Sequence, residues 1–573
     1  MLSSLSLLGL IAYMFFSLGH AANSTIYNPI FPGFYPDPSC IFVPEKDNTF
    51  FCASSSFNAF PGIPIHASKD LQNWKLIGNA LNRKEQLPRL AETNRSTSGI
   101  WAPTIRFHDD TFWVVTTLVD DDRPQADPSR WDNIIFKAKD PYDPASWSIA
   151  THFNLTGYDP EPFWDTDGKA YINAAHAWQV GPYIVQAQVD LNTGKLLTDW
   201  NIIWNGTGGL APEGPHIYHK DGWYYLLAAE GGTGVDHMVT MARSKSLSGP
   251  FESYEHNPVL SNANTTSLFQ TVGHSDVFQD QNENWWAVAL STRSGPEYLH
   301  YPMGRETVMT AVSWPADQFP VFTPISGEVS AWPFPGPSTN ATISPDSVNS
   351  LAPEILTFSA STPLPAHFLH WRYPNPDHFA VSPPEHPNSL RLSPSNINLT
   401  ALNGNYAGPG GQSFISRRQQ HTLFNFSVDL DFSPAQLEEE AGVTAFLTQN
   451  HHLDMGIVLL PSRENSTALV PHIRFRGESY VPVPKEVVVP VPDEWRGKTL
   501  TLGIRVGNRT HFEFGVGVKG GQFTTVGVGG NEVVSWGFTG TLLGVYATNN
   551  GKGGTTPGYF SNWRYMPVAQ LRE

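Results

Sequence analysis

The 573-residue chain has only two cysteines and lacks the short motifs that mark most zinc, nucleotide and serine-hydrolase sites. It contains no Cys-x-x-Cys pair, no His-Glu-x-x-His, no phosphate-binding loop and no Gly-x-Ser-x-Gly elbow. One Gly-x-Gly-x-x-Gly spacing, at 515–520, has no strand-to-helix context and indicates a glycine-rich hairpin. Cys40 and Cys52 fall in one predicted hairpin, where a cross-strand disulfide and two buried thiols both stay open.

Charged residues are also few, at 15% of the chain against about 25% in average proteins. The 52 acidic residues outnumber the 35 lysines and arginines, and the formal net charge is −17. Such a surface repels nucleic acid and anionic lipid. The balance therefore excludes a nucleic-acid-binding protein and favours a neutral or cationic substrate.

Apolar runs long enough to span a membrane are absent from the sequence. Leu5 to Leu18 is mostly apolar but shorter than the ~20 residues of a spanning helix, and small residues follow it. We expect a signal peptide over 1–21 and a secreted, extracellular protein without membrane association, although the first residues lack lysine and arginine. Ten Asn-x-Ser/Thr sequons support a secreted glycoprotein. They begin at Asn23, Asn94, Asn154, Asn205, Asn264, Asn340, Asn398, Asn425, Asn465 and Asn508.

Glycine, proline and aromatic residues are abundant. The chain has 48 glycines and 48 prolines, and aromatic residues make up 12% of it. Glycine and proline mark turns, whereas aromatic residues favour pleated, half-buried surfaces. The composition argues against a helical bundle, a coiled coil or a disordered chain, and it predicts an all-β protein of many short strands.

Five segments in the first half share one pattern: a polar residue beside proline or glycine, an alternating strand, a polar turn and an aromatic-rich strand. Their anchors lie 54 to 64 residues apart. This period, with several strands in each unit, is typical of propeller blades, which are four-stranded sheets around a central channel. The anchors would meet at one channel mouth, and the alternative is a sandwich with coincidental spacing. The anchors are Asp37, Trp101, Asp159, Glu213 and His274.

The sequence predicts two β domains. We expect a five-bladed β-propeller catalytic domain over 22–335 and a linker rich in proline and serine over 336–353. Alternating strands resume over 354–573 and indicate a β-sandwich. A helix-like stretch at 433–441 is expected to connect two of its strands.

Three acids hold equivalent positions in the repeat: Asp37, Asp159 and Glu213. Carboxylates gathered in a partly dry pocket push each other's pKa values apart, so one stays protonated while another is ionised. Cleavage of a glycosidic bond needs such a pair, an acid for the leaving oxygen and a base or nucleophile across the sugar. A single acid of this kind would more simply be a turn or capping carboxylate.

Seven segments carry a further pattern, namely 28–39, 55–57, 61–71, 99–103, 211–216, 229–233 and 303–307. Together they resemble glycoside hydrolase family 43, and most closely its β-xylosidases and α-L-arabinofuranosidases with an appended sandwich. The resemblance covers nearly the whole mature chain. It implies a five-bladed β-propeller followed by a concanavalin-like β-sandwich. It also implies inverting exo-hydrolysis that releases terminal α-L-arabinofuranose, β-D-xylose or both from xylan, arabinoxylan or their oligosaccharides in plant cell walls.

The resemblance assigns roles to the three acids. Asp37 resembles the general base that activates water, and Glu213 resembles the general acid that protonates the leaving oxygen. Asp159 resembles the third carboxylate, which orients the acid and raises its pKa. The motif departs from the family pattern at Pro160-Glu161. We expect Glu161 to face away from the pocket.

The resemblance also implies substrate-binding residues. Phe57 and Trp101 resemble walls that pack against sugar faces. Arg305 resembles an arginine near the substrate hydroxyls and the acids, unless it pairs with Glu306 between blades. Tyr158 is a candidate selector between xylose and arabinofuranose.

Two further expectations concern the channel and the cleft rim. His274 resembles an axial histidine beneath the sugar, which in some members ligates Ca²⁺. The chemistry itself requires no cofactor, so a metal on His274 would be a structural Ca²⁺. Trp536 or Phe538 is expected to reach from the sandwich to the rim, with the sandwich core as the alternative for each.

Two other functions are alternatives to this prediction. A fructan- or sucrose-cleaving relative would retain configuration and carry Arg-Asp-Pro and Glu-Cys, where this chain has Tyr158-Asp159-Pro160 and Glu213-Gly214. A non-catalytic glycan-binding protein would need the aromatic residues but not the full acid set. The sequence leaves the oligomeric state undetermined.

Overall fold

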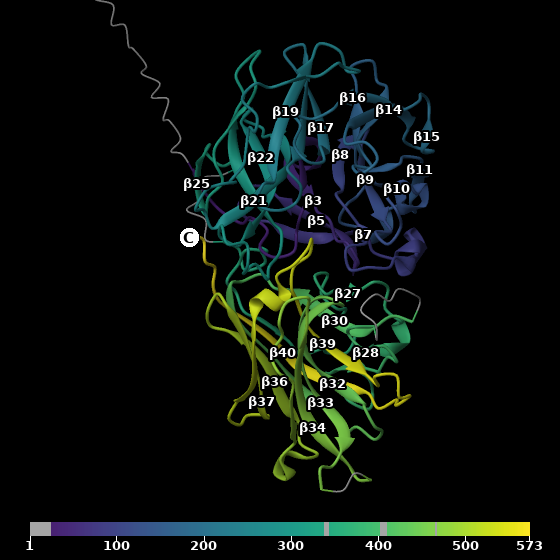
Figure 1. Ribbon diagram of the computed structural model, residues 1–573, viewed down its shortest axis with the longest axis vertical. Helices are drawn as coiled ribbons and strands as arrows, with labels where there is room; N and C mark the ends of the chain where they lie inside the picture. The colour runs from purple at the N-terminus through teal and green to yellow at the C-terminus, as the bar shows by residue number, and fades with distance from the viewer. Residues whose placement is uncertain (1–23, 337–342, 402–409, 465–466) are drawn as a thin grey trace, which may run out of the picture.

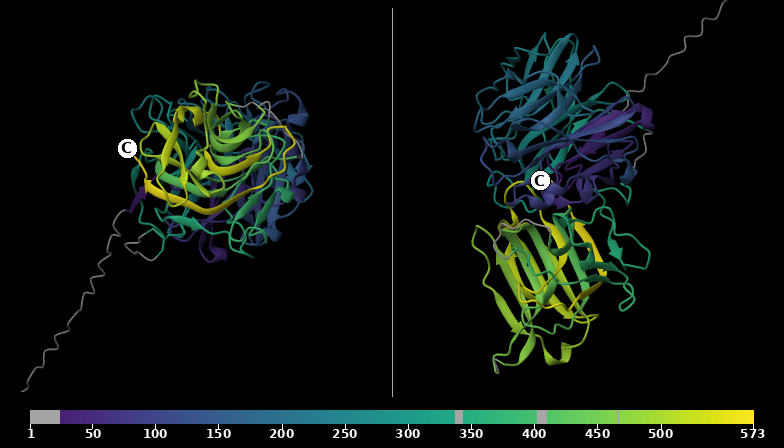
Figure 2. Two further views of the ribbon diagram at one scale, coloured as in Figure 1. Left: turned by 90° about the horizontal axis from the view of Figure 1, so that it is seen from below. Right: turned by 90° about the vertical axis from the view of Figure 1, so that its right-hand side faces the viewer.

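The computed structural model describes residues 24–336, 343–401, 410–464 and 467–573, and nearly all of their regular structure is β-strand (Figure 1). The predicted signal peptide lies outside these residues. Within them, every helical segment is a 3₁₀ turn of three to five residues, and no helix is long and apolar enough to cross a membrane. The two β domains lie one above the other, with the chain's C-terminus at their junction (Figures 1 and 2).

The N-terminal domain is a β-propeller. Within 24–336, five antiparallel sheets follow one another along the chain, and the first long strand of each contacts the corresponding strand of the next. These five inner strands, β2, β8, β12, β17 and β21, form a closed ring. The sheets comprise β2(Ser39–Val43), β3(Thr49–Ala53), β5(Gly62–Ser68) and β6(Lys75–Leu81); β7(Gly99–Ile100), β8(Thr104–His108), β9(Thr111–Val119), β10(Trp131–Ala138) and β11(Thr151–Phe153); β12(Gly157–Trp164), β13(Ala170–His176), β14(Ile184–Asp190), β15(Lys195–Leu196) and β16(Asn201–Trp204); β17(Glu213–Lys220), β18(Trp223–Glu230), β19(Met238–Ser244) and β20(Glu252–Ser253); and β21(Phe269–Gln279), β22(Trp285–Arg293), β23(Glu306–Ser313) and β24(Val321–Phe322).

The hairpins form where the sequence places turn residues. Between β17 and β18, Asp221 and Gly222 adopt φ of +53° and +68°, the backbone of a two-residue type I′ turn. Asp109 and Asp110 do the same between β8 and β9, at +49° and +51°. These turns match the twist of the flanking strands and keep each hairpin in register.

A strand pair and a disulfide stabilise the N-terminal part of the propeller. β1(Ser24–Tyr27) pairs with β25(Glu328–Ala331), so the start of the described chain lies beside the end of the propeller. Cys40 and Cys52 face each other across β2 and β3 and form a disulfide, which resolves the alternative of free thiols.

The C-terminal domain is a sandwich of two antiparallel sheets, seen from two sides in Figure 2. Aromatic and aliphatic side chains from both sheets, among them Phe426, Val443, Phe514 and Trp563, fill its core. The predicted all-β class, with a propeller and a sandwich, is therefore confirmed. The strands are β26(Glu354–Leu356), β28(Phe379–Val381), β29(Leu390–Leu392), β31(Leu423–Asp431), β36(Leu500–Val506), β37(His511–Val518), β38(Thr524–Gly530) and β40(Gly558–Ala569) in one sheet, and β30(Ser413–Arg418), β32(Glu440–Thr448), β33(His451–Pro461), β34(Leu469–Glu478), β35(Val487–Pro490) and β39(Leu542–Thr548) in the other.

The stretch at 433–441 is not helical. Residues 433–439 form an irregular turn, and β32 begins at Glu440. The Glu439 carboxylate accepts hydrogen bonds from the backbone N–H groups of Ala435, Gln436 and Thr556. These bonds give the backbone N–H groups acceptors that a helix would otherwise supply, so the side chain of Glu439 competes with helix formation.

The two domains interlock along one face of the propeller. β4(Ala59–Phe60) of the propeller pairs with β27(His370–Trp371), which lies between the sandwich strands β26 and β28 in the chain. The Arg418 side chain donates to the Phe34 carbonyl at 2.7 Å, and the Thr541 N–H donates to the Pro302 carbonyl at 2.7 Å. The sandwich thus stands directly over the channel mouth where the predicted anchors meet.

Candidate active site

A small pocket lies at this mouth, and it gathers eight of the nine residues predicted for the site. Its floor and walls come from the inner ends of the propeller sheets and from one sandwich loop. Trp536 is the predicted residue outside the lining. The lining residues are Asp37, Phe57, Trp101, Ala102, Tyr158, Asp159, Glu213, Thr233, His274, Arg305 and Phe538.

Local backbone geometry turns three predicted residues toward the pocket. The register of the inner strands shifts between Tyr158 and Glu161, between Glu213 and His216, and between Gly273 and Asp276. Asp37, Asp159 and His274 have φ of +53°, +53° and +46°. Left-handed φ at non-glycine residues costs free energy and is typical of functional sites.

Asp37 is held as a carboxylate. It is buried, and it accepts hydrogen bonds from Arg305 Nη1 and Nη2 at 3.0 and 3.3 Å and from Ser55 Oγ at 2.6 Å. Burial raises its pKa, but the charge of Arg305, the neighbouring His274 and the Ser55 hydrogen bond outweigh burial and lower the pKa of Asp37 below its ordinary value. An ionised carboxylate in this position can accept a proton from water.

Glu213 is held in the protonated form. Burial, together with the negative charge of Asp37, raises the pKa of Glu213 to about 7. The Tyr158 hydroxyl donates to Glu213 Oε2 at 3.0 Å. This hydrogen bond favours the charged form and opposes part of the rise. Glu213 can therefore carry a proton near neutral pH and give it up.

Asp159 is the third carboxyl of the pocket, and it is bound to the strand that carries Glu213. Its Oδ2 accepts the backbone N–H of Gly214 at 3.1 Å, which ties it to the residue beside Glu213. Burial and the charges of Glu213 and Asp37 raise the pKa of Asp159 well above its ordinary value. Burial and the charge of Asp37 account for the raised pKa of Glu213, so an effect of Asp159 on that pKa stays a prediction.

Arg305 does not pair with Glu306. Glu306 binds Arg293 instead, at 2.7 Å from Nε. Arg305 makes its bidentate contact with Asp37, and its Nε donates to the Phe538 carbonyl at 3.1 Å. The alternative of a blade-to-blade pair with Glu306 is not what the structure has.

Three aromatic rings form the apolar wall of the pocket. The ring centroids of Phe57 and Phe538 lie 5.7 Å apart, and Trp101 stands within 6.4 Å of both. Phe538 rather than Trp536 reaches in from the sandwich, because Gly537, with φ of +65°, turns the chain between them. Trp536 stacks instead on His451, with centroids 4.5 Å apart.

The surroundings of His274 do not fit the oxygen-rich set that Ca²⁺ prefers. His274 Nδ1 lies 3.8 Å from Asp37 Oδ1, and burial lowers the pKa of His274 to about 4, so the ring is neutral near pH 7. Its neighbour beyond Gly273 is a second imidazole, His237. Across the described ranges, no group of three or more His, Cys, Asp or Glu side chains could hold a metal.

Glu161 does not line the pocket, in agreement with its expected direction, but it has a defined partner. It is buried beneath the pocket and pairs with Arg106 at 2.9 Å. Asp276 lies in the fifth repeated segment beside the anchor His274, but the sequence pattern assigns no role to it or to Arg106. The only signal for them was position, since each lies on the inner strand of a predicted blade.

Comparisons with known proteins agree with this architecture. The family model described as "Glycosyl hydrolases family 43" matches residues 26–320, and that described as "Beta xylosidase C-terminal Concanavalin A-like domain" matches residues 357–566. A non-reducing end alpha-L-arabinofuranosidase of Bacteroides ovatus is 32% identical over 547 residues, 94% of each chain. A xylosidase/arabinosidase of Humicola insolens is 30% identical over 572 residues, 95% of this chain and 98% of that one.

Solved structures have the same fold over nearly the whole chain. A xylan beta-1,4-xylosidase of Bacillus halodurans superposes with a TM-score of 0.81 at 27% identity, covering 94% of this chain and all of that one. A family 43 protein of Bacteroides ovatus gives a TM-score of 0.81 at 31% identity, covering 95% of this chain and all of that one. With its family models, relatives and fold in agreement, the chain belongs to family 43 of the glycosyl hydrolases.

Proposed function

We propose that this protein is an inverting exo-glycosidase that releases terminal α-L-arabinofuranose, β-D-xylose or both from xylan, arabinoxylan or their oligosaccharides. One observation carries the proposal: a single pocket holds an ionised carboxylate, Asp37, and a carboxyl kept protonated near neutral pH, Glu213. These are the two states that single displacement at a sugar carbon requires. The names of the relatives point to pentosyl substrates.

In the proposed reaction, Asp37 removes a proton from water while the water oxygen bonds to the anomeric carbon. The glycosidic C–O bond breaks, and the proton of Glu213 passes to the departing oxygen. The sugar leaves with inverted configuration, Asp37 is protonated and Glu213 is ionised. Exchange of one proton with solvent restores both groups. Arg305 keeps Asp37 oriented, and Asp159 holds the backbone beside Glu213 through the Gly214 N–H.

The shape of the pocket supports removal of end groups. The aromatic rings of Phe57, Trp101 and Phe538 surround a small space above the acids and suit the apolar face of one sugar ring. The Tyr158 hydroxyl is engaged by Glu213. Its role as selector between the two pentoses stays a prediction, as does the substrate contact of Trp536.

Product analysis on arabinoxylan by NMR tests the proposal. The expected result is free pentose whose first-formed anomer is opposite to that of the bond cleaved, with the polymer backbone otherwise intact. A product of retained configuration would overturn the inverting mechanism. Fructose release from a fructan, or binding without turnover of any pentosyl glycan, would support the two alternatives instead.

The protonation of Glu213 should make the activity depend on pH. Glu213 must be protonated, so kcat/KM is expected to fall as pH rises through about 7, the pKa of Glu213. Tyr158→Phe removes a hydrogen bond that stabilises the charged form of Glu213, so this limb should move to higher pH. Tyr224→Phe is the matched control, because its hydroxyl binds Asp165 in the same domain at 2.8 Å. A limb that moves to lower pH in Tyr158→Phe would contradict the assignment.

We also propose that the protein is a secreted glycoprotein. The disulfide between Cys40 and Cys52 suits an oxidising compartment. The seven sequon asparagines among the described residues are all exposed or half-buried, so a glycan could be attached at each. Peptide mapping of protein secreted from its native cells should find a mature N-terminus at residue 22 and glycans on some of these asparagines. Intracellular retention with an intact N-terminus would contradict this proposal.

A further inference from the structure

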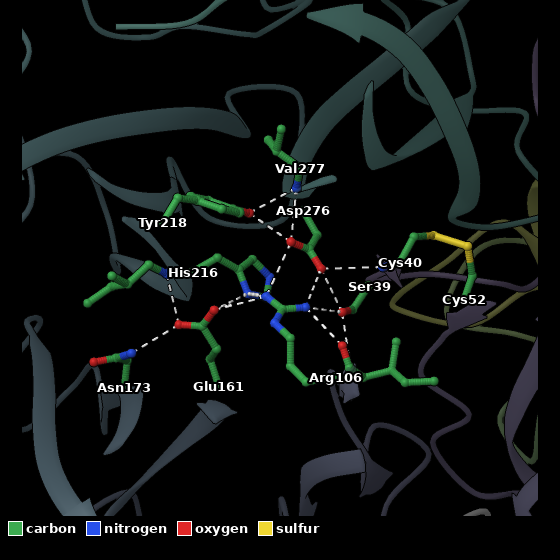
Figure 3. A network of polar contacts seen from close by, with 12 residues as sticks. Ser39, Cys40, Cys52, Arg106, Glu161, Asn173, His216, Tyr218, Asp276 and Val277 are labelled. Carbon is green, nitrogen blue, oxygen red and sulfur yellow. Dashed lines mark hydrogen bonds and ion pairs between the residues drawn. A yellow bond between two sulfur atoms is a disulfide. The ribbon is translucent and has the colours of Figure 1, made fainter. Parts of the chain in front are cut away.

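A cluster of polar side chains lies beneath the pocket, and each of the five inner strands contributes one of them (Figure 3). We call Ser39, Arg106, Glu161, His216 and Asp276 the axial cluster. They come from β2, β8, β12, β17 and β21 in that order. The cluster therefore contacts every sheet of the propeller ring.

Arg106 is the centre of the axial cluster. Its Nη1 donates to Asp276 Oδ2 at 2.8 Å and to Ser39 Oγ at 3.1 Å, and its Nη2 donates to Glu161 Oε1 at 2.9 Å. Nη2 also lies 3.1 Å from His216 Nδ1. The carboxyl side chains of Glu161 and Asp276 are 1% and 0% exposed. Two buried carboxylates are thus bridged by one guanidinium fork.

Four members of the axial cluster come shortly after a pocket residue in the chain. Ser39, Glu161 and Asp276 each follow a pocket residue by two positions, and His216 follows Glu213 by three. The shifted register of β12, β17 and β21 lies between the two layers. A displacement in the cluster must therefore move the pocket residue on the same short stretch of backbone.

Hydrogen bonds link the two layers directly. Glu161 Oε2 accepts the Ile217 N–H at 2.8 Å, while Asp159 Oδ2 accepts the Gly214 N–H at 3.1 Å. These two carboxylates fix β12 against β17, the strands that carry Asp159 and Glu213. On the other side, Asp276 accepts the Ser39 hydroxyl at 2.7 Å and ties β21 to the strand that follows Asp37.

We propose that Arg106 is the resident cation of the propeller channel, in the place where a metal ion was expected, and a positioning residue for the three pocket acids. Without a cation the two buried carboxylates would repel each other and separate. Guanidinium matches two carboxylates with a planar fork, whereas Ca²⁺ would need six to eight oxygen ligands. Arg106 touches neither substrate nor reacting atoms, and it acts through the strands. The kinetic part of this inference rests on the proposed pentosidase activity.

The test uses Arg106→Ala and Arg106→Lys in the full-length protein. For Arg106→Ala we expect kcat to fall about 100-fold, the cost of an ångström-scale misplacement of catalytic groups, because the pocket walls remain while the acids shift. KM should change by less than about threefold, since the binding contacts are retained. Lysine keeps the charge but cannot bridge both carboxylates, so Arg106→Lys should recover only part of the loss.

Guanidinium rescue separates positioning from simple destabilisation. Millimolar guanidinium chloride should restore kcat of Arg106→Ala by about tenfold or more, because the ion can occupy the vacated fork. Equimolar NaCl should not. Arg243→Ala is the matched control. Arg243 lies in β19, away from the inner strands, and its guanidinium packs on the rings of Trp223 and Phe319. Its kcat should stay near that of the unmodified protein and should not respond to guanidinium.

Calcium titration of the unmodified protein gives a second measurement that does not depend on the folding of a variant. Calorimetry should detect no stoichiometric Ca²⁺ binding, and chelation should leave activity and melting temperature unchanged. The inference is overturned if Ca²⁺ binds at one site and chelation abolishes activity, if folded Arg106→Ala keeps kcat within about threefold, or if guanidinium fails to rescue it. Absence of pentosidase activity in the unmodified protein would instead refute the proposed function. The calcium titration would still test whether the channel binds a metal ion.

Discussion

Glu213→Gln is expected to lower kcat/KM on an arabinoxylan oligosaccharide by about 10²- to 10⁴-fold, the range that general acid catalysis contributes. Glutamine keeps the size of the side chain and its place beside Tyr158, but it has no acidic proton to give to the leaving oxygen. The loss should lie mainly in kcat, because the aromatic walls and Arg305 that would bind the sugar stay in place.

The leaving group provides the internal check on this prediction. A nitrophenyl pentoside departs without much help from an acid, so the same variant should lose far less activity on it than on the oligosaccharide. Asp165→Asn, which alters an acid on the Asp165–Gly168 turn of the propeller, should lose little on either substrate. Equal losses of Glu213→Gln on both substrates would show that Glu213 is not the general acid.

Asp37→Asn should cause a loss at least as large on every substrate, because activation of water is needed whatever the leaving group. Asparagine is the suitable replacement: it tolerates the left-handed backbone of this position, φ +53°, better than alanine does. The uncompensated Arg305 will also lower stability. Circular dichroism and the melting temperature must therefore accompany the kinetics.

Azide distinguishes loss of the base from loss of the fold. In Asp37→Gly the backbone conformation is accepted and space opens where the carboxylate stood. Azide, which needs no base, should attack the anomeric carbon and yield a glycosyl azide of inverted configuration, with the Glu213 proton leaving on the departing group. Full activity of either variant, or a retained glycosyl azide, would exclude Asp37 as the general base.

The propeller could be predicted from the sequence because each blade is marked by residues that lie close together in the chain. Each blade repeats a Pro- or Gly-flanked anchor and a turn such as Asp221-Gly222, whose positive φ values define a hairpin. The anchors Asp37, Asp159, Glu213 and His274 could then be placed at one channel mouth. The structure brings them together in one pocket.

The remaining features depend on contacts across the fold. Arg106 and Asp276 are 170 residues apart, and neither has a local pattern that marks it as part of a network. Whether Trp536 or Phe538 reaches the pocket depends on the single turn at Gly537. The partner of Arg305 depends on Arg293, which binds Glu306 from the neighbouring strand. The helix-like pattern at 433–441 was overridden by hydrogen bonds to Glu439.

The carbonyl of Phe538 has a consequence for how such enzymes can be recombined. It accepts the Nε–H of Arg305, and Arg305 in turn holds Asp37, so a backbone atom of one domain orients the proposed general base of the other. A propeller joined to a foreign sandwich would lose both an aromatic wall and this restraint. The two domains are therefore needed together for activity. Exchange of domains within this family should preserve activity only where the loop 535–540 is kept with the propeller that it contacts.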